Sequence, residues 1–245
     1  MKIFGKTEKG PYRESNQDAF FTGIFETGDC WAVVCDGMGG VSGGQIASGI
    51  CAEKTAEAIK RGYRENITIN AARNLLNSAI CSANHAVFDE SQKKNELRGM
   101  GTTIVAAMVI KGVAVVAHVG DSRAYLVSDK LLPITKDHSL VQVMIDTGKI
   151  TEDEAKVHPD RNIITRAVGI MGFVDVEFDF VDINEGKSLL LCTDGLSGCT
   201  EEEEIYNIIR EYGDSSTEKL VEKAIASGGR DNITVVLLVA DVQGE

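Results

Sequence analysis

Short apolar runs rich in Val, Ile, Leu and Ala recur along the chain and predict β-strands. The clearest predicted strands are Trp31–Cys35, Thr103–Ile110, Val113–Val119, Arg123–Val127, Ser188–Cys192 and Ile233–Ala240. Lys111-Gly112 joins two of them by only two residues, which is typical of a hairpin and predicts antiparallel pairing. Because these runs are apolar at successive positions, we expect both faces of each sheet to be covered.

Segments with helical spacing of their apolar residues lie between these strands. Gln45–Gly62 and Ile69–Glu90 predict two long helices after the first clear strand. Near the C-terminus, Thr200 is the expected cap of an acidic first turn, and Ser216–Ser227 predicts a further helix. We expect one of these helix pairs to cover the outer face of each of two sheets, and this arrangement is an α+β fold. It is a four-layer α-β-β-α sandwich with two central antiparallel sheets.

The segment from about Asp137 to Gly169, which we call the flap, departs from this pattern. It is polar and irregular, with short helical patterns at His138–Thr147 and after Thr151. Insertions of this kind between strands are where functional segments concentrate. We therefore expect the flap to contribute to function.

The length of 245 residues fits one large domain or two small ones. No proline- or serine-rich linker divides the chain, and its three prolines are dispersed. The candidate site residues described below also span nearly the whole length. We therefore predict a single domain over residues 1–245, with enough apolar residues to bury a sizeable core.

Composition excludes several classes of function. The net charge of −12 argues against nucleic acid as a partner, because such binding requires Lys and Arg to neutralise phosphates. No apolar stretch reaches the roughly 18 residues needed to cross a bilayer, so no membrane association is expected. The N-terminus lacks the long apolar segment of a signal peptide, and the six cysteines form no CxxC pair. These features predict a cytoplasmic location.

Four aspartates stand in glycine-containing turns at the ends of apolar runs. Asp36, Asp121 and Asp194 follow such runs, and Asp231 precedes one. Any one of them could simply form a turn. Several rigidly held carboxylates brought together would repel one another, and a hard divalent cation relieves that repulsion. The set therefore predicts an oxygen-ligand metal site, with Mg²⁺ or Mn²⁺ favoured over zinc.

Seven motifs in a fixed order carry a family resemblance. They are Arg13…Asp18, Asp36-Gly37-Met38-Gly39-Gly40, Gly101-Thr102-Thr103, Val119-Gly120-Asp121-Ser122-Arg123, Asp137-His138-Ser139, Thr193-Asp194-Gly195 and Asp231-Asn232-Ile233-Thr234. In this order the chain resembles the metal-dependent serine/threonine protein phosphatases of the PPM or type-2C family, in their compact bacterial form. The same α-β-β-α layering is implied by this resemblance.

The resemblance also implies roles for the candidate metal ligands. Asp36 matches the ligand that bridges two cations, and Gly37 matches a ligand through its backbone carbonyl. Asp194 and Asp231 match ligands of the first cation, and Asp18 matches an acid that holds metal-bound water. Asp121, together with Asp194, matches a weaker third cation site.

Candidates for binding the substrate come from the N-terminal segment and the flap. Arg13 matches an arginine whose guanidinium fork binds the substrate phosphate. His158 and Arg166 are the candidate substrate contacts from the flap. Where some members of the family have a histidine after the metal Asp-Gly, this chain has Met38. His118 is expected to be a core residue, and His138 to stabilise the base of the flap.

The implied reaction is the hydrolysis of phosphoserine or phosphothreonine in proteins by a hydroxide that bridges two cations. The expected partners are phosphorylated proteins, including Ser/Thr kinases and their substrates, and the expected state is a monomer. Two alternatives stay open. One is a pseudophosphatase that keeps the fold as a binding module, and the other is a phosphatase of the same fold in a partner-switching pathway. Neither alternative requires a different fold.

Overall fold

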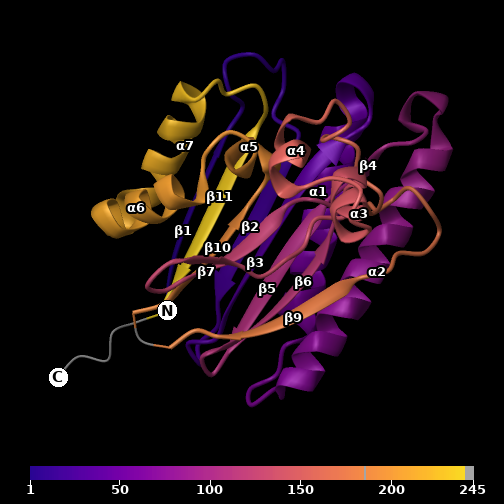
Figure 1. Cartoon of the computed structure of the whole chain (residues 1–245). Coiled ribbons are helices and arrows are strands. Elements are labelled where there is room, and N and C mark those ends of the chain that lie inside the picture. The colour runs from indigo at the N-terminus through magenta and orange to yellow at the C-terminus, as the bar shows by residue number, and fades with distance from the viewer. Residues whose placement is uncertain (185, 241–245) are drawn as a thin grey trace.

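The computed structural model describes residues 1–184 and 186–240, with the side chains of residues 41 and 42 left undescribed. Two β-sheets lie face to face in the middle of the molecule, and helices cover their outer faces (Figure 1).

Both sheets are antiparallel throughout their named pairings. The first sheet has the order β1 (Lys2–Glu8), β11 (Ile233–Val239), β10 (Ser188–Cys192), β7 (Arg123–Val127) and β8 (Leu131–Pro133). The second sheet has the order β2 (Asp18–Ile24), β3 (Cys30–Met38), β5 (Ile104–Ile110), β6 (Val113–Val119) and β9 (Glu177–Asp182), and β4 (Gly101–Thr102) also pairs with β3. Strands from the two ends of the chain therefore meet as neighbours β1 and β11.

Helices pack on the outer faces and in the flap. The second sheet is covered by α1 (Gly40–Gly62) and α2 (Ile69–Lys93). The first sheet is covered by α5 (Asp194–Ser197), α6 (Glu202–Tyr212) and α7 (Ser216–Ala226). The flap contains α3 (Leu140–Asp146) and α4 (Glu152–Val157), and single 3-10 turns lie at Asn95–Leu97 and Gly213–Ser215.

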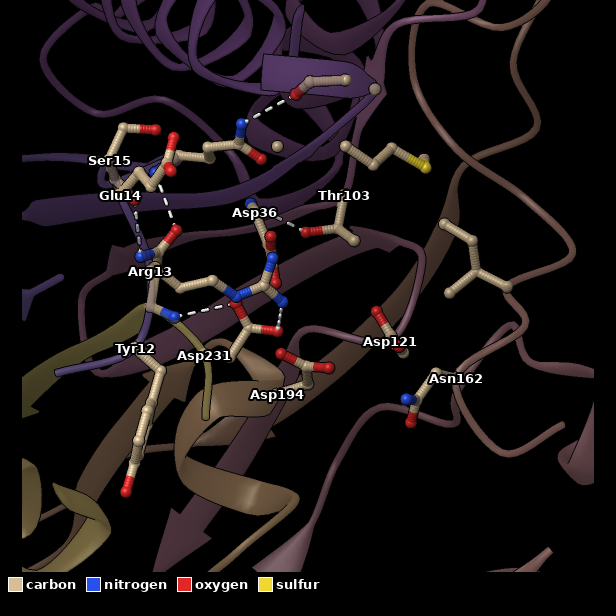
Figure 2. A pocket seen from close by; sticks show the side chains of 17 residues that line it. Tyr12, Arg13, Glu14, Ser15, Asp36, Thr103, Asp121, Asn162, Asp194 and Asp231 are labelled. Atoms are coloured by element: carbon tan, nitrogen blue, oxygen red, sulfur yellow. Dashed lines mark hydrogen bonds and ion pairs between the residues drawn. The ribbon is translucent and has the colours of Figure 1, made fainter. Parts of the chain in front are cut away.

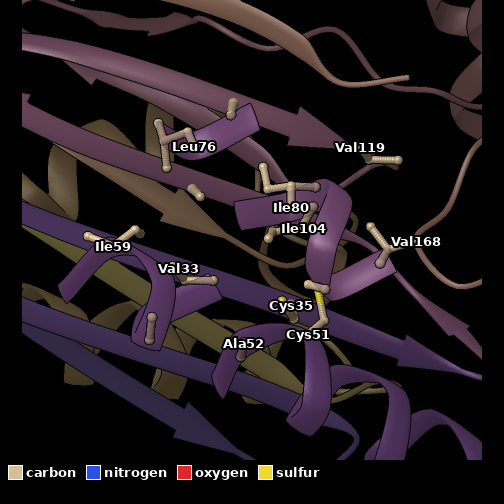
Figure 3. Packing of buried hydrophobic residues seen from close by; sticks show 14 of the residues in the cluster. Val33, Cys35, Cys51, Ala52, Ile59, Leu76, Ile80, Ile104, Val119 and Val168 are labelled. Atoms are coloured by element: carbon tan, nitrogen blue, oxygen red, sulfur yellow. The ribbon is translucent and has the colours of Figure 1, made fainter. Parts of the chain in front are cut away.

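Apolar side chains fill three layers of core, one between the sheets and one under each helix layer. Strand β3 shows how this arises, because its successive side chains point to opposite faces. Val33 packs under α1 and α2, together with Leu76 and Ile80, while Val34 packs between the sheets (Figure 3). A strand covered on both faces must be apolar at every position, and this layering confirms the predicted α-β-β-α sandwich.

The predicted hairpin at Lys111-Gly112 is also confirmed, since both residues have positive φ (50° and 82°) between β5 and β6. Two predicted helix starts are wrong. Helix α1 begins at Gly40 rather than at Gln45, so part of the glycine-rich segment is helical. Helix α6 begins at Glu202, and Thr200 is a buried residue of the preceding turn instead of its cap.

The connections at one end of the sandwich position the functional site. Residues 9–17 and 120–122 each cross from one sheet to the other there, and β3 ends beside them. The register places the start of β2 opposite the end of β3, and the start of β11 opposite the end of β1. Within the described ranges, no helix is both long and apolar enough to span a bilayer.

Candidate metal centre and active site

A pocket of about 670 Å³ opens at this end of the sandwich (Figure 2). Its walls come from the 9–17 connection, the end of β3, the turn after β6, the start of α5, the start of β11 and the flap. The lining residues include Arg13, Asp36, Gly37, Asp121, Asn162, Asp194 and Asp231. Side chains far apart in the sequence thus meet because several strands of both sheets begin or end here.

Asp18 and Asp36 are directly opposite each other on the neighbouring strands β2 and β3. Opposite residues of an antiparallel pair project to the same face, so these two carboxylates are held on one side of the sheet. Asp18 is oriented by two hydroxyl groups, because its Oδ2 accepts hydrogen bonds from Thr193 Oγ1 at 3.0 Å and from Thr234 Oγ1 at 2.6 Å. Thr193 directly follows β10 and Thr234 lies on β11, both strands of the first sheet, so the first sheet fixes the carboxylate of Asp18 on the second sheet.

The backbone of Asp36 is fixed by the next strand segment. Its amide donates to Thr103 Oγ1 at 3.0 Å, and its carbonyl accepts from Thr103 N and Thr102 Oγ1 at 2.8 Å each. Gly37, the next residue, leaves no room for a side chain, because an added Cβ would lie 2.0 Å from the carbonyl oxygen of Gly44. The end of β3 and the start of α1 can approach this closely only with glycine at this position.

Three further carboxylates complete the cluster, and Figure 2 shows Asp121, Asp194 and Asp231 facing the same space as Asp36. Asp121 lies in the turn that joins β6 to β7, and Asp194 is the first residue of α5. Asp231 lies just before β11 and accepts a hydrogen bond from the amide of Asn232 at 2.8 Å. The predicted metal aspartates are thus brought together at one site.

Burial and mutual repulsion favour the neutral forms of Asp18, Asp36, Asp121 and Asp194 when no cation is present. Burial raises the pKa of Asp18 to about 7 despite its hydrogen bonds from Thr234 and Thr193, and burial with the charge of Asp194 raises the pKa of Asp121 to about 7. Burial and the neighbouring carboxylates raise the pKa of Asp36 well above its ordinary value, and burial with Asp231 raises that of Asp194. A bound cation would reverse each of these shifts.

Two oxygen atoms in the cluster support a cation in particular. Asp18 Oδ1 and Asp194 Oδ1 are buried and have no hydrogen-bond partner in the described part of the chain. A buried carboxylate oxygen without a partner costs free energy unless a ligand satisfies it. The potential metal ligands in this cluster are carboxylate and carbonyl oxygens, which suit Mg²⁺ or Mn²⁺. The residues present therefore fit divalent cations.

Arg13 lies at the edge of the cluster, on the 9–17 connection. Its Nη2 donates to Asp231 Oδ2 at 2.5 Å, and its Nε donates to the carbonyl of Arg230 at 3.1 Å. Asn232 holds the connection in place, because its amide donates to the carbonyls of Lys9 and Ser15 and its Oδ1 accepts from the amide of Gln17. A cationic fork is thus presented beside the carboxylates.

The flap forms part of the pocket wall. The flap residues in that wall differ from the two that the sequence predicted as substrate contacts. His158 ends α4, and its Nδ1 accepts a hydrogen bond from the amide of Asp160. Arg166 donates to Glu177 Oε1 at 2.6 Å, at the base of the flap. Neither residue lines the pocket, whereas Asn162 and Ile164 do. Local and basal contacts hold the side chains of His158 and Arg166 outside the pocket lining, and their contact with a substrate stays a prediction.

Several supporting residues were not predicted as part of the site. Thr193 and Thr234 orient Asp18, Thr103 fixes Asp36, and Asn232 holds the segment that carries Arg13. All four lie within the quoted motifs, next to or near the aspartates. Their presence in those motifs was the available signal, but their partners lie on other strands. Only the fold shows which groups they contact.

Comparisons with known proteins agree with this geometry. The family model described as protein phosphatase 2C matches residues 12–227. The serine/threonine phosphatase stp of Listeria monocytogenes serotype 4b is 36% identical over 245 residues, covering 97% of this chain and 95% of that protein.

Solved structures show the same fold. The structure of serine/threonine phosphatase Stp1 from Staphylococcus aureus superposes with a TM-score of 0.91 at 32% identity, covering 98% of this chain and 95% of that one. The catalytic domain of the phosphatase PstP, solved in complex with two manganese ions, superposes with a TM-score of 0.85 at 30% identity, covering 98% of each chain. With the matching family model, these similarities show that the chain belongs to the protein phosphatase 2C family.

Proposed function

We propose that this protein hydrolyses phosphoserine and phosphothreonine in proteins, with divalent cations held in the acidic pocket. The observation that carries the proposal is the convergence of Asp18, Asp36, Asp121, Asp194 and Asp231, with two buried carboxylate oxygens that lack a partner among the described residues. The membership of the protein phosphatase 2C family supports the reaction class. The serine/threonine phosphatases among its relatives support the choice of residue.

Each residue has a proposed part in holding the cations or the substrate. Asp36, the carbonyl of Gly37, Asp194 and Asp231 would hold a central pair of cations, with Asp18 beside them. Asp121 and Asp194 would hold a weaker third cation. When bound, such cations supply charge neutralisation for the phosphoryl group and lower the pKa of a nearby water.

Arg13 would bind the phosphate of the substrate with its planar fork. In the structure this fork contacts Asp231, so a cation taken up by Asp231 would compete with that ion pair. No histidine is among the residues that line the pocket in the described ranges, and Met38 lies there instead. We therefore assign no protein side chain as the acid that protonates the leaving alkoxide.

The proposal also covers the metal, the partners, the oligomeric state, the cellular location and the domain organisation. Manganese or magnesium is expected in the cell, and the relative solved with two manganese ions supports a central pair. Phosphorylated Ser/Thr kinases and their substrates are the proposed partners, and the monomer is the proposed state. The six cysteines are free thiols, which suits the cytoplasm. Pairing of β1 with β11 supports one domain over residues 1–245.

A phosphothreonine peptide and a phosphotyrosine peptide of the same sequence test the proposal directly. Phosphate release should require Mn²⁺ or Mg²⁺, should favour the phosphothreonine peptide, and should stop in excess chelator. Asp36→Asn should nearly abolish release, whereas the matched control Asp129→Asn, in the exposed turn between β7 and β8, should not change it. Full activity in chelator, or in the Asp36 variant at saturating metal, would refute the metal assignment. A folded protein that binds Mn²⁺ and the phosphopeptide without releasing phosphate would instead indicate the pseudophosphatase alternative.

A further inference from the structure

His138 lies where the two ends of the flap meet the rest of the molecule. Its backbone amide donates to the carbonyl of Gly120 at 2.9 Å, and its carbonyl accepts from the amide of Thr165 at 2.7 Å. Ser139 and Ile164 form an isolated bridge beside it. His138 is therefore bonded to the turn that carries Asp121 on one side and to the returning end of the flap on the other.

The imidazole ring of His138 also makes contacts on two sides, to Gly120 and to Glu177. Its Nδ1 accepts a hydrogen bond from the amide of Gly120 at 3.1 Å, and its Nε2 lies 3.2 Å from Glu177 Oε1. Because Nδ1 accepts, the single proton of the neutral ring lies on Nε2 and is donated to Glu177. Burial and the nearby His118 lower the pKa of His138, which favours this neutral ring. The ring thus joins Gly120 to Glu177 by two directed hydrogen bonds.

The surroundings of the ring fix its position. His118 stacks on it with 4.6 Å between ring centroids, and His118 Nε2 bonds to the carbonyl of Lys136. Arg166 binds Glu177 from the flap, and its Nη1 also lies 3.9 Å from Asp175 Oδ2 and 3.3 Å from His138 Nε2. His118, His138 and Glu177 are close enough to hold a metal ion. In this arrangement, however, both nitrogens of His138 are already engaged, and the Arg166 cation occupies Glu177. We therefore read the cluster as a structural link.

The ends of the flap joined by this link carry pocket residues. Ile164, in the bridge with Ser139, and Asn162, two residues before it, both line the pocket that holds the aspartates. Asp121, on the other side of the link, follows Gly120 directly. A rigid connection between these two sides determines how far the flap residues stand from the carboxylates.

We propose that His138 is a positioning residue that couples the flap to the turn carrying Asp121, and thereby places Asn162 and Ile164 against a bound phosphoprotein. A small phosphate ester reaches only the carboxylates and Arg13, so it should be insensitive to this link. A phosphoprotein also meets the flap, so it should depend on it. The inference about the substrate rests on the proposed phosphatase activity, whereas the coupling itself does not.

Two variants separate the two hydrogen bonds of the ring. The Oδ1 of asparagine can replace Nδ1 as an acceptor for Gly120, while the amide of glutamine can replace Nε2–H as a donor to Glu177. We therefore compare His138→Asn and His138→Gln with Glu177→Gln, which alters the link without changing the histidine. His85→Asn on α2 is the matched control, since His85 is exposed and its Nδ1 bonds to the carbonyl of Cys81 in the same helix.

The first readout is hydrogen–deuterium exchange of the metal-free proteins at a temperature where each is folded. We expect faster exchange in residues 139–165 for His138→Asn, His138→Gln and Glu177→Gln, and faster exchange at Gly120 for His138→Gln alone. The second readout is kinetics with Mn²⁺. The three variants should lose about tenfold in kcat/KM on a phosphoprotein, which corresponds to roughly one hydrogen bond, and stay within about twofold on p-nitrophenyl phosphate.

The outcomes are distinguishable. Wild-type exchange in the flap of all three variants would overturn the coupling. An equal fall on both substrates would also overturn it, because His138 would then serve general stability. If the wild-type protein hydrolyses neither substrate, the proposed function fails, while the exchange measurements still decide the coupling.

Discussion

At the scale of single residues, the pocket gathers carboxyl groups whose ionised forms the protein alone would leave unbalanced. The single cationic side chain among the residues that line the pocket in the described ranges is Arg13, which contacts Asp231 and is half-exposed. The exposed surface contributes many ion pairs, but pairs of that kind add little stability. Arg13 differs from them because its partner is a candidate metal ligand and because it lines the pocket.

Replacement of Arg13 by alanine should weaken transition-state binding by about 2–3 kcal/mol, because a charge-assisted bidentate contact is lost. The loss should be larger in KM than in kcat, since the fork contacts the phosphate both before and during the reaction. Arg13→Lys should recover only part of it, because an ammonium group lacks the planar fork. Steady-state kinetics on a phosphothreonine peptide measure both parameters, with Arg64→Ala, an exposed residue just after α1, as the control. Full recovery with lysine would show that the fork geometry has no part in binding.

At the scale of elements, the flap is attached firmly at its base while its outer part is exposed. Arg123 binds Asp137 through two hydrogen bonds of 2.8 and 2.7 Å where the flap begins. Val168 bridges to Thr102 where it ends, and Gly169 donates to Asn84 of α2. Between these points, α3 has no buried residue and α4 buries only Ala155. The low burial indicates that the outer flap can open at little cost in free energy.

Asp121→Ala tests whether the action of the flap on a phosphoprotein depends on a third cation. A site with only two carboxylates should bind Mn²⁺ weakly and retain most of its waters. The variant should therefore keep the central pair, lose a weak class of Mn²⁺ sites in a titration, and lose more activity on a phosphoprotein than on a small ester. A thermal melt provides the control. A lowered melting temperature with unchanged turnover on both substrates would show that Asp121 only forms the turn.

At the scale of the whole molecule, the acidic cluster ties stability to pH and to metal. It lies where the two sheets, the flap and the 9–17 connection meet, so its repulsion acts on all of them. In the unfolded chain the same carboxyls titrate near pH 4. In the folded, metal-free protein the pKa of Asp18 and of Asp121 is raised to about 7. Folding therefore takes up protons in the interval between these values.

The melting temperature of the metal-free protein should therefore fall as pH rises from about 5 to about 8. The sign follows from the raised pKa values, since the neutral carboxyls that the fold favours are lost as pH passes through the folded pKa. Saturating Mn²⁺ should remove most of this decline, and Asp36→Asn should reduce it without metal. Melts in chelator at a series of pH values provide the measurement. A melting temperature that stayed level or rose over this interval would contradict the electrostatic assignment.

The sequence by itself determined the layers of the fold and the chemistry of the site. Strands β6, β7 and β10 have the predicted bounds because they are apolar on both faces, and that pattern requires cover on both sides. Strands β1, β2 and β9 were not predicted, because each lies at the edge of its sheet and mixes polar with apolar positions. The aspartates were identifiable because each stands in a turn with glycine or asparagine at a strand boundary.

Only the tertiary structure decided which groups act together. The register places Asp18 opposite Asp36, and strands of the other sheet bring Thr193 and Thr234 to the same carboxylate. It also brings Asn162 of the flap, instead of His158 or Arg166, to the pocket. Residue type and spacing along one strand can be read from the sequence, because they depend on neighbours within the same segment. Contacts between segments depend on how the two sheets and the flap pack, and no local pattern contains that information.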